Sequence, residues 1–124
     1  MHNFRELNIW KKAMDLANQI LKCSKDFPNE YKFSLTSQIS RSAISIPSNI
    51  AEGSSRRTNK DFARFLDIAQ GSAYELETQL LLSESIDLME QDKMQLLLKD
   101  LNDLQKMIYG SKKTLNKNRK NYLI

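Results

Sequence analysis

Apolar residues recur at intervals of three and four along four stretches of this 124-residue chain, the spacing of one face of an α-helix. The four predicted helices cover residues 7–26, 35–52, 59–85 and 90–115. Proline cannot continue a helix, so Phe27-Pro28 ends the first, and Gly53-Ser54-Ser55 ends the second. Short connections place consecutive helices antiparallel. The pattern therefore predicts an all-α fold, an antiparallel up-and-down four-helix bundle.

Each predicted helix carries a stripe of positions expected to face the core. In the first helix the stripe is Leu7, Trp10, Met14, Ala17 and Leu21. In the second it is Leu35, Ile39, Ser42, Ile46 and Ile50. In the third it is Phe62, Leu66, Ala69, Ala73, Leu76 and Leu80. The fourth has the most regular stripe, Met94, Leu97, Leu101, Leu104, Ile108, Ser111 and Leu115.

Local signals refine the helices. Ser34 is expected to cap the second helix, and Thr58-x-x-Asp61 resembles a capping box that opens the third. Pro47 removes a backbone donor inside the second helix, so we expect a kink or a break there. Gly71 lies inside the third helix and leaves two interpretations open. It reflects local packing, or Gly71, Ser72 and Ala73 form a smooth patch where a helix of the same or a neighbouring subunit approaches closely.

Composition agrees with a helical fold. The chain has three Gly, two Pro and no Val, so it is poor in turn and strand residues, which argues against an all-β fold. With 40% hydrophobic residues it can build a core, which argues against intrinsic disorder. The length fits one domain. We expect residues 1–115 to form the bundle and residues 116–124 to form a basic C-terminal tail.

Charge is distributed unevenly along the chain. The net charge of +4 combines +2 over residues 1–33, +3 over residues 34–60, −7 over residues 61–92 and +6 over residues 93–124. Two basic groups stand out as candidate contacts for nucleic-acid phosphates. They are Arg56, Arg57 and Lys60 at the start of the third helix, where amide donors and the helix dipole favour anions, and Lys112, Lys113, Lys117, Arg119 and Lys120 near the end. Solvated surface charge is the competing interpretation for both groups.

Four other charged residues have a structural interpretation. Facing positions in an antiparallel hairpin have a nearly constant sum of residue numbers, and two opposite-charge pairs between the second and third helices share the sum 116. They are Glu52 with Arg64 and Arg41 with Glu75. We therefore expect these side chains to form ion pairs within the chain rather than to contact a ligand.

Catalytic, metal-binding and membrane-spanning signals are missing from the sequence. His2 is the single histidine, so neither a Ser-His-Asp triad nor a histidine metal site is available, and no glycine-rich phosphate loop occurs. Cys23 is a lone cysteine, expected at the core boundary, and gives no sign of an oxidising compartment. No stretch is apolar enough to span a bilayer. We expect a soluble, cytoplasmic, non-enzymatic protein without cofactor or metal.

The segment Ser37-Gln38-Ile39-Ser40-Arg41-Ser42-Ala43-Ile44-Ser45-Ile46-Pro47-Ser48-Asn49-Ile50-Ala51-Glu52-Gly53 resembles the signature of a bacterial family, the 23S ribosomal RNA intervening-sequence proteins, also called the S23 family. Further matches are Leu7-x-x-Trp10-x-x-Ala13, Phe27-Pro28 and the stretch from Phe65 to Leu80. The resemblance implies a four-helix bundle and an RNA-related role. A related branch, the accessory proteins of diversity-generating retroelements, forms pentameric barrels that bind nucleic acid and a reverse transcriptase.

Residues and resemblance together support one functional hypothesis and one alternative. The hypothesis is a homo-oligomer, a pentamer as the resemblance implies, that binds RNA or another nucleic acid as an accessory factor. The alternative is a protein-interaction scaffold without a nucleic-acid role, in which the acidic segment from Asp67 to Asp92 meets a basic partner. A helical stripe cannot reveal stoichiometry, so the pentamer rests on the resemblance alone.

Overall fold

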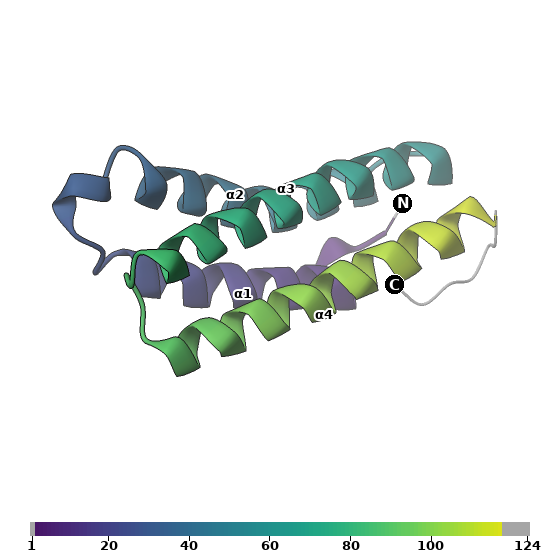
Figure 1. Cartoon of the computed structure of the whole chain (residues 1–124). Helices are drawn as coiled ribbons and strands as arrows, with labels where there is room; N and C mark the ends of the chain where they lie inside the picture. Colours follow the sequence, from purple (N-terminus) through teal and green to yellow (C-terminus); the bar gives the residue numbers. More distant parts are fainter. Residues whose placement is uncertain (1, 118–124) are drawn as a thin grey trace.

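The computed structural model describes residues 2–117, and within this range the chain is all-helical (Figure 1). The four long helices are α1 (Asn8–Ser24), α2 (Leu35–Ser54), α3 (Asn59–Ser85) and α4 (Gln91–Asn116). Two short 3-10 helices, η1 (Phe4–Glu6) and η2 (Asn29–Tyr31), precede α1 and α2. Each long helix packs against the next, and α4 returns to pack against α1. The predicted antiparallel four-helix bundle is therefore confirmed.

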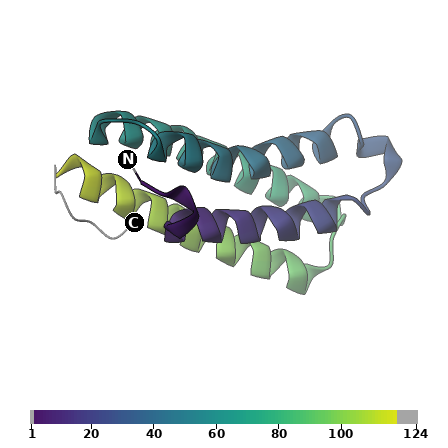
Figure 2. The same ribbon diagram turned by 180° about the vertical axis from the view of Figure 1, so that it is seen from behind.

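Both ends of the described chain lie at one end of the bundle, beside the loop between α2 and α3 (Figures 1 and 2). The backbone N–H of His2 donates to the carbonyl oxygen of Ser54 at 3.0 Å. The His2 ring packs against the Phe62 ring in a tilted arrangement, with 5.3 Å between the ring centroids. These contacts fix the start of the chain beside the α2–α3 loop.

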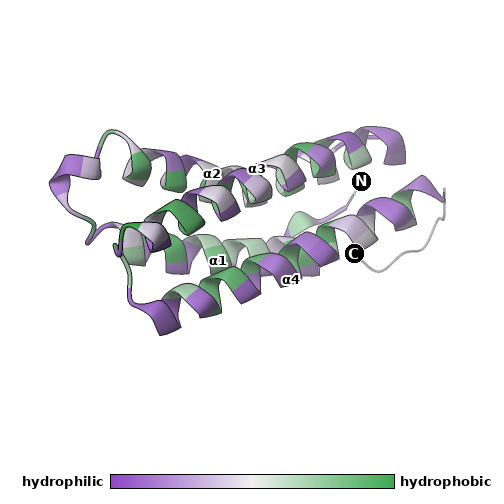
Figure 3. Ribbon diagram, in the orientation of Figure 1, coloured by the Kyte–Doolittle hydropathy of each residue, from purple (hydrophilic) through white to green (hydrophobic). Residues whose placement is uncertain are grey.

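The core follows the predicted stripes in three of the four helices. In α3 and α4 every predicted inward residue is buried, as are Ile39, Ser42, Ile46 and Ile50 in α2. Hydrophobic and hydrophilic residues alternate along all four helices, as amphipathic helices require (Figure 3). Leu35 at the start of α2 is half-buried. The 3.6-residue period thus locates most of the core.

The predicted inward stripe of α1 is partly wrong. The residues that α1 buries most fully are Ile9, Ala13, Leu16 and Ile20, whereas Met14 is 44% and Leu21 37% exposed. Two neighbouring stripes on this helix have the same three-and-four spacing, so periodicity alone cannot choose between them. The bundle covers the stripe that begins at Ile9. Of the predicted stripe, Leu7 and Ala17 are buried as expected, whereas Met14 and Leu21 face the outside beside α2.

The cap and proline predictions have different outcomes. Thr58 accepts the backbone N–H of Asp61 at 3.1 Å, which confirms the predicted cap of α3. Ser34 precedes α2 but its hydroxyl donates to the carbonyl of Tyr31 at 3.4 Å, so its side chain does not cap the helix. Pro47 lies inside an α2 that continues on both sides. A break at Pro47 is thereby ruled out, and a kink stays a prediction.

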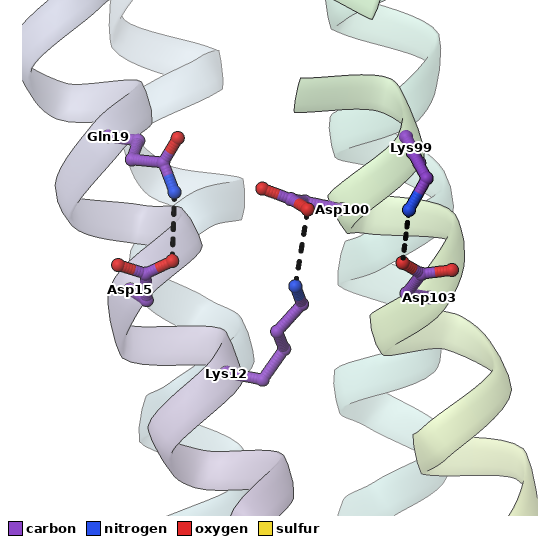
Figure 4. A network of polar contacts seen from close by, with 6 residues as sticks. All are labelled: Lys12, Asp15, Gln19, Lys99, Asp100 and Asp103. Atoms are coloured by element: carbon purple, nitrogen blue, oxygen red, sulfur yellow. Dashed lines mark hydrogen bonds and ion pairs between the residues drawn. The ribbon is translucent and has the colours of Figure 1, made fainter. Parts of the chain in front are cut away.

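Polar contacts link α1 to α4 along their shared edge (Figure 4). The ammonium of Lys12 donates to Asp100 at 3.2 Å, and both side chains are partly buried. Gln19 donates to Asp15 on the α1 side, at 2.8 Å. The bundle is therefore closed between its first and last helices by an ion pair as well as by apolar packing.

Candidate nucleic-acid interface

The two basic groups, separate in sequence, converge at one end of the bundle. The α2–α3 loop and the last turns of α4 both lie there, because α3 and α4 run antiparallel (Figure 1). A pocket of about 330 Å³ is lined by Lys60, Asp61, Arg64 and Asp67 from α3 and by Lys112 and Asn116 from α4, so three cationic side chains share it with two carboxylates. The pocket therefore brings Lys60 of the first basic group close to Lys112 of the second.

The start of α3 combines a capped helix terminus with exposed cations. Thr58 occupies one backbone donor of the first turn, through the N–H of Asp61. Lys60 and Arg57 are exposed, and neither forms an ion pair with any residue between 2 and 117. The positive end of the α3 dipole adds to their field. This segment therefore presents two unneutralised side chains to an anion.

Two other arginines are held by an aromatic ring. The guanidinium carbons of Arg56 and Arg64 lie 4.7 and 4.9 Å from the centroid of the Phe65 ring. Arg56 also donates to Glu52 at 3.1 Å, one turn earlier in the chain. Cation–π contacts orient a guanidinium without cancelling its charge. Arg64, although predicted as a structural residue, therefore belongs to the basic end.

The cationic side chains at the end of α4 differ in the contacts that they make within the chain. Lys112 forms an ion pair with Asp67 of α3, which neutralises part of its charge. Lys113 lies over the ring of Tyr109, at 5.7 Å from its centroid. Lys117 is exposed. Arg119 and Lys120, together with most of the predicted tail, lie outside the described residues.

The predicted ion pairs between α2 and α3 do not form, although the predicted register is close. The hydroxyls of Ser45 and Ser72 are 2.8 Å apart, which gives a sum of 117 for facing residues. Glu52 nevertheless pairs with Arg56, because that side chain is one turn away on the same surface. Arg41 and Glu75 are exposed, and neither has an ion-pair partner among residues 2–117.

The predicted patch of Gly71, Ser72 and Ala73 is divided between two environments. Ser72 and Ala73 are buried, and Ser72 contacts Ser45 where α2 and α3 approach each other. Gly71 is exposed, and a Cβ added to it would meet no atom within 4 Å. Close packing inside the bundle therefore explains Ser72 and Ala73, and leaves Gly71 unexplained.

Gly53, which the sequence predicts only as the end of α2, is a positioning residue. A Cβ added to it would lie 2.6 Å from the Cβ of Phe65 and 2.9 Å from the Phe62 ring. Real Cβ atoms essentially never come so close to other atoms. Gly53 thus lets the end of α2 touch the start of α3, which sets the path of the basic loop. A conflict of this kind has no local sequence signal.

Two further reactive side chains are His2 and Cys23. Burial, and secondarily the charge of the chain's amino terminus, lower the pKa of His2 below its usual 6.5. Cys23 is a half-buried free thiol. Residues 2–117 contain no group of three or more His, Cys, Asp or Glu side chains arranged to hold a metal ion. None of the helices in this range is long and apolar enough to cross a membrane.

Comparison with known proteins identifies the family. The model of the family described as 23S rRNA-intervening sequence protein matches residues 5–110. A solved structure from Bacteroides thetaiotaomicron, described as a protein of unknown function from the S23 ribosomal protein family, has 28% sequence identity and a TM-score of 0.77. The match covers 82% of this chain and 95% of that one. A search of curated proteins finds no match. The family match, with the four-helix fold behind it, shows that the chain belongs to the 23S rRNA-intervening sequence proteins.

Proposed function

We propose that this protein is a non-enzymatic, cytoplasmic nucleic-acid-binding protein that contacts the phosphate backbone of RNA with the basic end of the bundle. The basic end is defined as residues 55–66, which are the α2–α3 loop and the first two turns of α3, and residues 109–117, which are the last two turns of α4 and the residue after it. The convergence of its cations carries the proposal. Arg57, Lys60 and Lys117 point to no carboxylate within residues 2–117, so an anion can engage them without displacing an existing partner.

The distribution of charge along the bundle also favours nucleic-acid binding at the basic end. Of the seven acidic residues of α3 and its connection to α4, Asp61 lies within the basic end and Asp67 next to it, whereas five lie beyond the middle of α3, at Glu75, Glu77, Glu84, Asp87 and Glu90. A polyanion is repelled there and attracted to the basic end. The field of the whole molecule therefore orients an approaching strand toward the α2–α3 loop.

Self-association is the second part of the proposal. One bundle offers few phosphate contacts, and several bundles in one assembly engage a strand at several places at once. The family resemblance implies a pentamer. A ring of bundles with parallel axes would bring all basic ends to one rim, where their contacts add.

The experiment is fluorescence anisotropy of a labelled single-stranded RNA titrated with the full chain at several salt concentrations. With about five phosphates engaged per binding unit, log K should fall with log salt with a slope of roughly −3 to −5. The double variant R57Q/K60Q should bind more weakly and reduce the slope by about 1.4 to 1.8.

The matched control removes two lysines from the opposite end, in the variant K22Q/K93Q. Both of these side chains are exposed, so the control makes the same change in net charge. Its slope should stay at the wild-type value. The proposal fails if the wild type does not bind at low salt, or if the two double variants lose affinity equally.

The alternative function is a protein-interaction scaffold, and exposed apolar residues in the acidic part of the chain favour it. Leu82 and Ile86 of this segment are 54% and 45% exposed. Apolar side chains among acidic ones suit a partner helix with basic and apolar residues. A pull-down from cells with and without nuclease separates the functions. Partners lost on nuclease treatment support nucleic-acid binding, and partners retained support the scaffold.

A further inference from the structure

An open apolar groove runs along the outside of the bundle between α1 and α2. It has a volume of about 580 Å³, and its apolar wall is formed by Trp10, Met14, Leu21, Ile44, Pro47 and Ala51. Met14 and Ile44 are 44% and 49% exposed. The groove contains the α1 stripe that the bundle itself leaves uncovered. Apolar surface of this kind marks a contact site on a soluble protein.

A second, separate surface, which combines apolar and charged side chains, lies on the outward face of α3. Arg64, Ile68, Gly71, Glu75 and Leu82 follow one another at helical spacing and are all exposed. Ile68 is 43% exposed. At Gly71, with no atom within 4 Å of its missing side chain, this face has a notch that allows another backbone to come close.

The two surfaces lie at matching heights along the bundle. Ser45 of α2 contacts Ser72 of α3, so these two residues lie at the same height. Because α2 and α3 are antiparallel, Asn49, four residues after Ser45, lies level with Ile68, four residues before Ser72. Asn49 is next to Ser48 of the groove. Counting three residues the other way brings Glu75 level with Ser42, beside Arg41. Arg41 continues the groove-side stripe of Ile44, Ser48 and Ala51, at spacings of three and four.

Charges at these heights are complementary between copies. If a second copy lies beside the first at the same height and in the same direction, its Ile68 meets the middle of the groove. Its Glu75 then meets Arg41. Arg41 and Glu75 have no ion-pair partner within residues 2–117 of their own chain. A contact between copies would give both Arg41 and Glu75 an ion-pair partner.

We propose that the α1/α2 groove of each copy receives the outward face of α3 from the next copy. The contact uses two different surfaces, so it is head-to-tail, and repetition without a rise along the bundle axis closes a ring. This inference rests on the self-association included in the proposed function, and it names the surfaces that perform it. It also gives Gly71 a role as the point of closest approach between copies.

Cross-linking between differently tagged, co-expressed copies tests the contact. In a C23S background, one copy carries M14C and the other carries I68C, and a short bismaleimide joins cysteines that lie close together. We expect a cross-linked species containing both tags. The matched control replaces I68C by L96C, because Leu96 is 64% exposed on α4, away from the proposed contact. This control pair should cross-link far less.

Light scattering of charge variants supplies an independent readout. I68E should weaken self-association by about 10- to 100-fold, since it removes an apolar contact and buries a charge. R41E and E75R should each weaken it, and a mixture of the two should associate more tightly than either alone. The mixture tests pairing between copies, because neither chain in it carries both substitutions.

The possible results test the contact between copies separately from the proposed nucleic-acid binding. Cross-links between M14C and I68C, together with loss of assembly in I68E, support the inference. Cross-links of M14C copies with one another indicate a symmetric contact and overturn it, while self-association stands. A wild type that is monomeric at micromolar concentration overturns both the ring and its surfaces. RNA binding is measured separately by anisotropy, so it stands or falls by its own result.

Discussion

Substitution of Gly53 by alanine tests how the bundle positions its basic end. The added Cβ would lie 2.6 Å from the Cβ of Phe65, an atom fixed to the α3 backbone that cannot rotate away. The Phe62 ring, 2.9 Å away, faces the same methyl group. α2 and α3 must therefore separate at this point. Forcing extra volume into a packed core costs about 1 to 3 kcal/mol, and the gain in helix propensity is less than about 1 kcal/mol at the end of a helix.

The assay is thermal unfolding of the full chain at one fixed protein concentration, with Gly110 as the internal control. G53A should lower the free energy of unfolding by about 1 to 3 kcal/mol and Tm by roughly 4 to 12 °C. Gly110 is an exposed residue inside α4 with no atom within 4 Å of an added Cβ, so G110A should raise stability by about 0.5 to 1 kcal/mol. A G53A protein as stable as the wild type would refute the argument from close approach.

Three further predictions concern single residues. T58A removes the cap of α3 and should lower stability by about 1 kcal/mol in urea unfolding, whereas T58S should retain most of it; equal losses would contradict the capping role. In an NMR titration His2 should titrate below 6.5, because burial disfavours its charged form; the folded protein then loses stability as the pH falls through 6.5, and a higher pKa would contradict this. G71Q should weaken self-association in light scattering while G110Q leaves it unchanged, and equal effects would count against the α3 contact.

The periodicity of apolar residues predicts the fold, because the apolar stripes that it identifies form most of the core. α3 and α4 each have one dominant apolar stripe, and the bundle buries it. The cap of α3 was also predictable, since Thr58 acts on a backbone donor only three residues away. Such signals are local, and the sequence displays them directly.

The features that sequence could not predict depend on contacts between helices. α1 has two adjacent apolar stripes, and only the position of its neighbours decides that Ile9 and Leu16 are buried while Met14 is exposed. The sequence predicts Arg64 as the partner of Glu52, whereas the structure joins Glu52 to Arg56 one turn later in the chain. The convergence of Lys60 with Lys112 required the antiparallel packing of α3 and α4. The two basic groups could therefore be predicted from the sequence, but their proximity in the folded bundle could not.

The central claim is that nucleic acid contacts the basic end of the bundle, and mapping the contact is the most direct test. A single-stranded RNA containing photoreactive 4-thiouridine would be cross-linked to the full chain, and the linked peptides would be identified by mass spectrometry. The account predicts cross-links in residues 55–64 and 109–117, with few in residues 75–92. Cross-links concentrated in the acidic segment, or spread evenly over the chain, would contradict it.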